Sequence, residues 1–485
     1  MKKLLFILFF QVSIVFGQSV DKFFHSIDDF GAKGDGVTLN TIAIQNAIDK
    51  CSENGGTVII PKGIYLTGSL ELKSNTDIYL MNGALLLGST QLKDYKEFLP
   101  QLKSYNDSFL RYSIFYAERV SNISIRGEGT IDGQGESFKV TTKEKPERYK
   151  NRPYIIRFVE CSKIKIEGIR LQNSAMWMQQ YLGCKDVTVK GISVFNHANP
   201  NNDMIDIDGC SNFIMSDCFG DSDDDAITIK STSPYVSENI TITNCVVSSH
   251  CNAFKLGTES TGGFRNITVS NIVIKPSSVK TTIYGTPGGI SGITLGAVDG
   301  GPLENITISN IVIEGVQVPF YLRLGNRGRK YTPDAPQPGI STFKNVFLSN
   351  IIATKLASNI GASITGVPDN YIENVTLSNI YVEYPGGGNE DDASKKLDEL
   401  IDHYPESTMW ETLPAYGVFI RHAKNITMNN VRFNIIEKDM RPAIILDDVE
   451  GITINDFETN SLDEKIKIEN SRFLKGNFFI NGTEK

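Results

Sequence analysis

The chain has 485 residues, of which 40% are hydrophobic and 21% are charged, and its formal net charge is −8. This composition predicts a folded protein, and the lack of a basic stripe in the sequence argues against nucleic acid as a partner. It does not argue against acidic glycans, because a local basic cleft can exist on an acidic protein.

The first residues predict an export signal. Met1-Lys2-Lys3 precedes an apolar run that ends with the small residue Gly17. The run is too short to cross a bilayer, and a basic start followed by such a run is typical of a cleaved signal peptide. The sequence has no later apolar run of transmembrane length. We therefore expect removal of residues 1–17, and a periplasmic or secreted protein with no membrane partner.

A glycine-rich segment at 27–41 leads into an amphipathic helical pattern at 43–48, and a strand and turn follow at 55–65. This opening resembles that of pectin-active β-helix enzymes. The resemblance implies a short helix that plugs the open end of a solenoid and protects its core. It concerns the fold and says little about the chemistry.

Short strand patterns recur through the rest of the chain, roughly every 22 to 40 residues. They begin at Asn122, Lys163, Asp186, Asn239, Asn266, Asn305, Asn374 and Asn425. Each alternates β-branched with polar residues, so each has an apolar face that it cannot bury alone. Stacked coils bury such faces in one continuous core. We therefore predict that residues 18–485 form a single domain, a right-handed parallel β-helix, and that the protein is a monomer.

The cysteines fit this stack better than they fit a disulfide framework. Five of the seven fall at about one per coil: Cys161, Cys184, Cys210, Cys218 and Cys245. Small side chains at strand ends predict a buried ladder, with a bridge between Cys210 and Cys218, or Cys245 and Cys251, as the alternative. Without CxxC pairs, and with only scattered histidines, we expect no transition metal and no cofactor. Calcium at the acidic stretch 221–225 is the alternative.

The acidic stretch 221–225 carries four carboxylates in five positions, directly before a strand. Like charges this close cannot all ionise, so at least one pKa should be raised, as a general acid requires. About twenty residues upstream, Asn202-Asp203 lies at the same phase of the repeat. Neighbouring coils would then present these carboxylates side by side. In isolation, such a cluster would more often be a solvated turn.

Together these two acidic segments resemble the motifs of glycoside hydrolase family 28, the polygalacturonase family, and the resemblance spans nearly all of the predicted mature chain. It implies an inverting glycoside hydrolase that cleaves a pectic or related plant or algal polysaccharide or oligosaccharide. Asp224 would protonate the leaving oxygen, while Asp203 and Asp225 would activate water. Asn202 would bind the substrate.

The sequence departs from the family pattern on the following coils. Where the family has Gly-His-Gly, alignment on Gly257 places Asn252, with His250 two residues earlier. Both are candidate substrate contacts, as is Lys255. Where the family has Arg-Ile-Lys, Thr294 and Gly296 replace the two cations that hold a galacturonate carboxylate. Lys255 or the basic loop 323–330, beginning with Arg323, could supply a replacement, so a neutral sugar is as plausible as galacturonate.

An insertion at about 385–416 interrupts the repeat, with a helix expected at 393–403 and several aromatic residues. Such a segment could wall the cleft and favour exo action, or it could pack on the coils for stability. Two other functions stay open at this point. A pectate-lyase-like β-eliminase would need a uronate and a basic side chain as its base, and a non-catalytic carbohydrate-binding β-helix would keep the fold alone.

Overall fold

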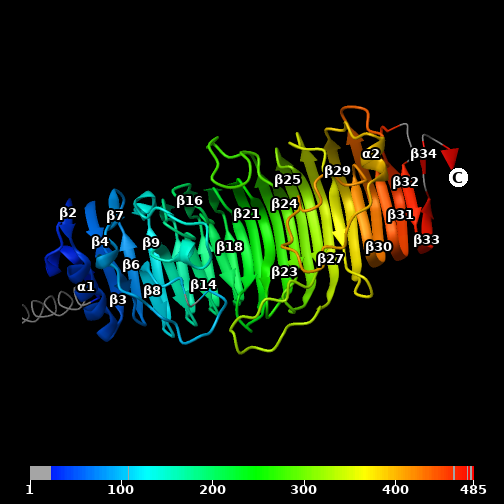
Figure 1. Cartoon of the computed structure of the whole chain (residues 1–485). Coiled ribbons are helices and arrows are strands. Elements are labelled where there is room, and N and C mark those ends of the chain that lie inside the picture. The colour runs from blue at the N-terminus through cyan, green and yellow to red at the C-terminus, as the bar shows by residue number, and fades with distance from the viewer. Residues whose placement is uncertain (1–22, 107–108, 462–464, 478, 481–482, 485) are drawn as a thin grey trace, which may run out of the picture.

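The computed structural model describes residues 23–106, 109–461, 465–477, 479–480 and 483–484, so the predicted signal peptide at 1–17 lies outside the described residues. In this part of the chain, 33 strands join in one sheet that winds along a single long axis (Figure 1). The pairs in this sheet are parallel, each joining strands of neighbouring coils. The predicted right-handed parallel β-helix is therefore confirmed.

The strands form three strips along the axis. Strip 1 consists of β5 (Leu70–Glu71), β8 (Ser113–Glu118), β11 (Tyr154–Val159), β14 (Gln179–Leu182), β17 (Ile205–Asp208), β20 (Ile227–Ser231), β22 (Asn252–Ser260), β24 (Ser291–Ala297), β26 (Val318–Leu324), β28 (Ala362–Thr365) and the starts of β30 (Val418–Ile435) and β31 (Ile444–Glu458), followed by β32 (Ile466–Glu469). Strip 2 consists of β1 (Phe24–Ser26), β3 (Gly56–Ile60), β6 (Thr76–Leu80), β9 (Ser121–Gly127), β12 (Ser162–Glu167), β15 (Lys185–Lys190), β18 (Ser211–Ser216), β21 (Ser237–Ser249), β23 (Phe264–Ile274), β25 (Leu303–Glu314), β27 (Phe343–Thr354), β29 (Ile372–Tyr384), the remainder of β30 and β31, and β33 (Arg472–Asn477).

Strip 3 consists of β2 (Asp35–Leu39), β4 (Gly63–Thr67), β7 (Ala84–Gly88), β10 (Thr130–Asp132), β13 (Arg170–Gln172), β16 (Ser193–Asn196) and β19 (Phe219–Ser222). From β21 onward, the strip 2 strands are long enough to continue into strip 3, since β19 pairs with the second half of β21. Short 3₁₀ turns lie at Ile27–Phe30, Leu92–Asp94, Gly135–Ser137 and Glu147–Tyr149. The hairpin of β34 (Phe479–Ile480) and β35 (Thr483–Glu484) follows the last coil.

Inward-facing side chains stack in register from coil to coil. On strip 2 one such column contains Ile164, Val187, Phe213, Ile240 and Ile267, all buried. Their polar neighbours in the strands face outward, which is the alternation seen in the sequence. Each coil thus covers the apolar face of the next, and the core runs the length of the solenoid.

Asparagines mark the bends between strips. Asn305 has a left-handed φ of 61°, and the same conformation recurs on neighbouring coils. Its amide donates to Asn266 at 3.1 Å and its oxygen accepts from Asn345 at 2.9 Å, so the side chains form a ladder. Asn is one of the few residues that adopt this conformation readily, because its short polar side chain bonds locally. A second ladder of the same kind includes Asn271, Asn310 and Asn350.

Helix α1 (Thr41–Asn54) covers the N-terminal end of the solenoid, as predicted (Figure 1). It buries Ile44, Ala47, Ile48 and Cys51 against the first coil. These positions follow the three- and four-residue spacing of one helix face. Among the described residues, no helix has the length and apolarity needed to cross a membrane.

All seven cysteines are buried and unpaired, so the alternative of a disulfide bridge is not realised. Cys161, Cys184 and Cys210 stand at equivalent positions directly before β12, β15 and β18, which are paired in register. Cys218 and Cys245 stack in the same way beside strip 3. The predicted ladder of small side chains is thus present.

The insertion leaves the strips after β29 and returns at β30. Its helix, α2 (Glu390–Ser394), overlaps the helix predicted for 393–403 only at residues 393 and 394, and residues 395–403 are not helical, so that prediction is wrong. Asn389 caps α2, since its side chain accepts a hydrogen bond from the Asp392 N–H. Beyond α2 the chain turns, because Leu397 and Trp410 pack on outward-facing apolar residues of strip 1 instead of continuing a helix.

Candidate active site

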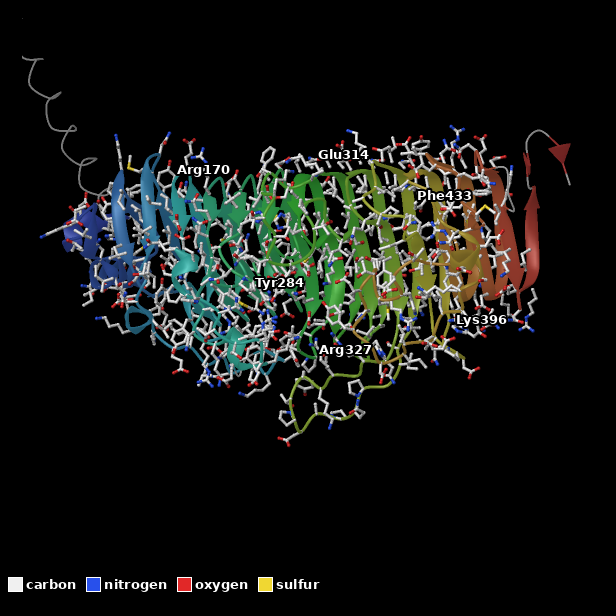
Figure 2. The ribbon with its side chains drawn as sticks, turned by 45° about the horizontal axis from the view of Figure 1, so that its top comes forward. Arg170, Tyr284, Glu314, Arg327, Lys396 and Phe433 are labelled. Carbon is white, nitrogen blue, oxygen red and sulfur yellow. The ribbon has the colours of Figure 1, made fainter. Side chains whose placement is uncertain are left out.

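A cleft of about 560 Å³ opens beside strip 1, where β14, β17, β20 and β22 begin. Tyr284 and Arg327, which belong to its walls, project from loops near the middle of the solenoid (Figure 2). The cleft is lined by polar and aromatic residues that include Tyr105, Lys145, Arg148, Tyr149, Trp177, Asn201, Asp203, Asp224, Asp225, Lys230, Lys255, Glu259, Arg329, Tyr404 and Glu406. Such a cleft, with many polar groups and several rings, suits a hydrated glycan.

The structure brings the two acidic segments together, because they precede paired strands on neighbouring coils. The N–H of Met204 donates to the carbonyl of Asp225 at 3.0 Å, and β17 pairs with β20. Asp203, Asp224 and Asp225 all line the cleft. The repeat phase in the sequence was therefore a sufficient signal for this arrangement.

Asp225 is fixed by three donors. Its Oδ1 accepts from the backbone N–H of Asn252 at 3.2 Å and from the Asn252 amide at 2.8 Å, and its Oδ2 lies 2.8 Å from Lys255 Nζ. Together these donors hold both carboxylate oxygens of Asp225 in place at the cleft wall.

Asp224 has fewer donors. Its Oδ1 accepts from the Asp225 N–H at 3.0 Å, and its Oδ2 lies 3.4 Å from the amide nitrogen of Asn201. Burial, and next the charge of Asp225, raise the pKa of Asp224 to about 6, against the opposing charges of Lys255 and Lys230. A carboxyl with such a pKa holds its proton in mildly acidic solution.

Asp203 is buried, and its Oδ1 has no hydrogen-bond partner in the described part of the chain. Burial, and then the charges of Asp206 and Asp224, raise its pKa well above the ordinary value, although Lys230 opposes this shift. The side chain borders the cleft, but this oxygen is itself buried.

Lys230 is the central cation of the cleft, and sequence reasoning missed it. Its Nζ lies 3.3 Å from Asp206, 3.6 Å from Asp203 and 3.5 Å from Glu259, and 4.5 Å from the centre of the Trp177 ring. Burial lowers its pKa, but the surrounding carboxylates outweigh this effect and raise it well above the ordinary value. Lys230 was visible in the sequence only as the last outward residue of a strand.

The basic loop 323–330 reaches the cleft through Arg327 and Arg329. Arg327 forms two hydrogen bonds with Asp299, of 3.0 and 2.5 Å, and Arg329 donates to Glu259 at 2.6 Å. Both arginines are thus already paired with carboxylates of the protein. The loop was expected to supply cations that replace the missing pair, and that expectation stays a prediction.

Arg323, the residue of this loop expected at the substrate, does not line the cleft. It is buried, and its guanidinium donates to the carbonyls of Gly366 at 3.0 Å, Glu399 at 2.6 Å and Leu400 at 3.2 Å. It also lies 5.1 Å from the centre of the Trp410 ring. Arg323 therefore holds the insertion on the coils.

Two other residues expected at the substrate, Asn202 and His250, are also buried inside the protein. The Asn202 amide donates to the carbonyls of Ser174 and Met176, each at 2.9 Å, and His250 is fully buried away from the cleft. Of the two candidates for the place of the family histidine, Asn252 is the one that contacts a cleft carboxylate, Asp225. Asn252 thus supports Asp225, Asn202 holds the backbone of the neighbouring coil, and neither lines the cleft.

Lys145 and Arg148 are the cations of the cleft without a carboxylate partner among the described residues. Arg148 lies 5.5 Å from the centre of the Tyr284 ring, and its Nε is buried without a hydrogen bond. Both come from the turn before β11. Neither residue could be found from the sequence, because this turn has no pattern that links it to the acidic motifs.

The insertion contributes Tyr404 and Glu406 to the cleft. Tyr404 is 51% exposed, and its Oη lies 3.5 Å from Lys255 Nζ. Burial raises the pKa of Glu406. The sequence left two alternatives for the insertion, a wall of the cleft or packing on the coils. The structure places its residues Tyr404 and Glu406 at the cleft.

A parallel β-helix with a carboxylate-lined groove and exposed rings has the architecture of a glycan-processing solenoid. The model of the glycosyl hydrolases family 28 matches residues 51–399, and the chain belongs to this family.

Comparison with known proteins supports the same class. The chain is 31% identical over 271 residues to a probable polygalacturonase of Vitis vinifera, covering 51% of this chain and 54% of that one. It is 37% identical over 156 residues to an exo-poly-alpha-D-galacturonosidase of Dickeya chrysanthemi, covering 30% of this chain and 25% of that one. The chain thus matches about half the length of the first of these proteins and a quarter of the second.

Two solved structures are similar in fold. An exopolygalacturonase from Thermotoga maritima matches with a TM-score of 0.65 at 22% identity, over 84% of this chain and 91% of that one. A family 28 exopolygalacturonase from Yersinia enterocolitica also matches with a TM-score of 0.65, at 19% identity, over 94% of this chain and 78% of that one. At these identities the likeness concerns the β-helix.

Proposed function

We propose that the protein hydrolyses glycosidic bonds in a pectic glycan that contains uronic acids, with inversion at the anomeric carbon. The observation that carries this proposal is the convergence of Asp203, Asp224 and Asp225, from neighbouring coils, on one cleft. Family membership and the polygalacturonase names of the relatives support it.

In the proposed reaction, Asp224 donates its proton to the glycosidic oxygen as the bond from that oxygen to the anomeric carbon breaks. A water molecule attacks the anomeric carbon from the opposite face and gives a proton to a carboxylate of the Asp203 and Asp225 pair. Lys255 and Asn252 hold Asp225 in a fixed orientation, as a base requires. The products are a shortened chain and a new reducing end with inverted configuration.

The charges of the cleft favour an acidic substrate. Thr294 and Gly296 carry no charge where the family has cations, and Arg327 and Arg329 are paired with protein carboxylates. Lys145 and Arg148 remain available to a ligand carboxylate. We therefore propose that these two side chains, from a different loop, take over the recognition of a uronate.

We also propose that residues 1–17 are cleaved and that the protein acts as a monomer in the periplasm or outside the cell. The basic start and the apolar run support the first part. Polymeric substrates that cannot enter a cell support the second.

The direct test is hydrolysis of polygalacturonate, rhamnogalacturonan and galactans by wild type and by the Asp224→Asn, Asp203→Asn and Asp225→Asn variants. Reducing ends are counted, and proton NMR follows the first anomer formed. We expect each variant to lose at least about 100-fold in rate, because general acid–base groups contribute on that order. Asp217→Asn, an exposed carboxylate outside the cleft, is the matched control and should behave as wild type.

Three outcomes would contradict the proposal. Unsaturated products that absorb in the ultraviolet would indicate elimination, retention of configuration would exclude an inverting mechanism, and full activity of Asp224→Asn would show that the acid lies elsewhere.

The Arg148→Gln variant tests the substrate class. Loss of a charged hydrogen bond of about 1.5 to 3 kcal/mol should raise KM on an acidic substrate by about tenfold or more, with a small change in kcat. Arg265→Gln is the control, because Arg265 is an exposed arginine that pairs with Glu238 on strip 2. An unchanged KM in Arg148→Gln would exclude this residue from uronate binding.

A further inference from the structure

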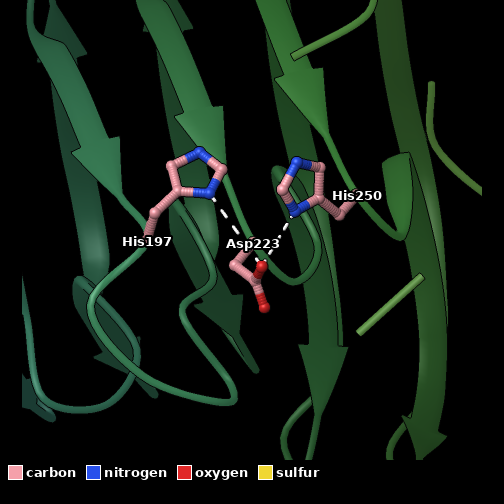
Figure 3. Close-up of side chains that lie close together, drawn as sticks. All are labelled: His197, Asp223 and His250. Carbon is pink, nitrogen blue, oxygen red and sulfur yellow. Dashed lines mark hydrogen bonds and ion pairs between the residues drawn. The ribbon is translucent and has the colours of Figure 1, made fainter. Parts of the chain in front are cut away.

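His197, Asp223 and His250 form a column beside strip 3. They directly follow Asn196, Ser222 and Ser249, which are partners in register on three successive coils. The sequence predicted no metal site because its five histidines are scattered, but the coils bring two of them to either side of one carboxylate (Figure 3). None of the three residues lines the cleft.

The potential ligand atoms of this column are close enough for one ion. His250 Nδ1 lies 2.8 Å and His197 Nδ1 lies 4.0 Å from Asp223 Oδ1, and one ligand atom from each residue falls within 4.8 Å of the others. Ligands at about 2.0 to 2.2 Å from a tetrahedral zinc ion are separated by roughly 3.3 to 3.6 Å. The observed separations bracket this value, so small side-chain rotations suffice.

The outer nitrogens of both rings are already engaged. His250 Nε2 lies 3.0 Å from the carbonyl oxygen of Val279, which can only accept, so this nitrogen carries a hydrogen. His197 Nε2 lies 2.9 Å from Asp221 Oδ1. A hydrogen bond from the outer ring nitrogen to a carboxylate or a carbonyl is the usual support of a histidine that binds a metal through its other nitrogen.

The inner nitrogen of His197, Nδ1, lacks a hydrogen-bond partner among the described residues. The His197 side chain is 6% exposed, and its Nδ1 is buried. With its hydrogen on Nε2, the ring directs a lone pair at the Asp223 carboxylate, and two electron-rich atoms face each other. A cation between them would replace this repulsion by attraction on both sides.

Asp223 and Asp221 are held in place from outside the column. Asp223 accepts from the backbone N–H groups of Ile283 at 2.9 Å and Tyr284 at 3.2 Å. Asp221 accepts from the hydroxyls of Ser277 and Ser278. These two carboxylates would balance the charge of one divalent ion.

We propose that His197, Asp223 and His250 bind one zinc ion through His197 Nδ1, a carboxylate oxygen of Asp223 and His250 Nδ1. The ion replaces the proton that His250 Nδ1 shares with Asp223, and this proton is released to solvent. Two imidazoles and a carboxylate are ligands suited to zinc, whereas calcium takes six to eight oxygens. The ion joins three successive coils beside the segment that carries Asp224 and Asp225. Its role is structural, because hydrolysis is assigned to the carboxylates of the cleft.

The test measures zinc itself, and therefore does not depend on activity. Wild type, His197→Gln, His250→Gln and the control His422→Gln are stripped with a chelator, incubated with zinc, dialysed and analysed for bound metal by mass spectrometry. His422 also contacts two carboxylates, Glu399 and Asp448, but lies outside the column. We expect one zinc per chain in wild type and in His422→Gln, and a loss of at least tenfold in affinity in the other two.

Thermal unfolding with and without zinc supplies a second measurement. Zinc should raise Tm by a few degrees in wild type and in the His422→Gln control but not in His197→Gln, since only the column would bind it. Less than a tenth of an equivalent of zinc in folded wild type would overturn the proposal. So would zinc binding that survives both column variants. An inactive protein that binds zinc, or an active one that does not, would separate this inference from the proposed function.

Discussion

Three carboxylates of the cleft, Asp203, Asp224 and Asp225, lie close to two ammonium groups and to the fully buried Asp206. Asp203, Asp206 and Asp224 all have raised pKa values, chiefly from burial, while Lys230 and Lys255 oppose the shift. With more negative than positive groups, the cluster binds protons more readily than isolated carboxyls do. The folded state would be more stable without some of these buried ionisable groups, but the proposed activity requires them.

Asp206 shows most clearly how a buried carboxylate lowers the stability of the folded state. Both of its oxygens are buried without a hydrogen bond among the described residues, and only the ion pair with Lys230 compensates them. Its pKa is raised in the folded state, so its contribution to stability is full below about pH 4 and is lost as the pH rises through the folded pKa. Asp206→Asn removes the ionisable group and with it the loss of stability at high pH. At pH 8 we expect this variant to be more stable than wild type by about 1 kcal/mol and therefore to unfold at a higher temperature. At pH 4 the two proteins should unfold at nearly the same temperature.

Asp208→Asn is the matched control, two residues along β17. Asp208 accepts from the N–H and hydroxyl of Thr232, at 2.8 and 2.6 Å, and from Gln180 at 3.0 Å. An amide in its place cannot accept all three bonds, so the control should unfold at a lower temperature at both values of pH. A stability gain of Asp208→Asn equal to that of Asp206→Asn would contradict this account.

The acidic residues were predictable because each motif is contiguous and the repeat phase links them. The roles of Asn202, His250 and Arg323 were not predictable. The sequence shows which donor groups a residue carries, but not which carbonyls inside the protein accept their hydrogen bonds. Lys230, Arg148 and Trp177 were missed for a related reason. Their place in the cleft depends on contacts between residues that are distant in the chain.

At the level of elements, the insertion depends on anchors at its base. Arg323 binds carbonyls within and beside it, and the buried pair of Arg441 and Asp439 contacts its two ends at Leu413 and Gly388. Its own apolar residues form a separate cluster outside the coils. A helix was predicted here from composition, but this packing overrides local propensity.

Arg323→Met should therefore loosen the insertion. The change leaves three carbonyls without their charged donor, and we expect a loss of about 2 to 3 kcal/mol in stability. Limited proteolysis should cut within 385–416 sooner than in wild type, whereas cleavage elsewhere should change little. Arg432→Met, which removes an exposed arginine paired with Glu458, serves as the control. Equal rates of cleavage in wild type and Arg323→Met would exclude the anchoring role.

At the scale of the molecule, stability is a sum over contacts between neighbouring coils. The fold was predictable because the strand pattern and the bend asparagines recur with one period. The three-strip cross-section was not, since short strands between the clear repeats carry few apolar residues. Strip 1 in particular holds buried polar residues such as Gln180 and Thr228, because β14 and β20 are buried on both faces and their burial does not alternate.

The asparagine ladder offers a test of this additive picture. Asn305→Gly keeps the left-handed conformation but removes the side-chain bonds, while Asn305→Ala removes both. We expect a loss of about 1 kcal/mol for the glycine variant and about 1 to 2 kcal/mol more for the alanine variant. Chemical denaturation at equilibrium measures both. A glycine variant no more stable than the alanine variant would indicate that the bend conformation adds nothing.

The proposed reacting carboxylates lie at the starts of strip 1 strands, whereas Lys145, Arg148, Arg327 and Tyr404 come from loops beyond the coils. Under the proposed function, chemistry and recognition lie on separate parts of the chain. Exchanging the loops at 139–151 and 325–342 for those of a related solenoid should then redirect hydrolysis to another polymer while the three strips stay unchanged. This makes the protein a suitable scaffold for grafting specificities.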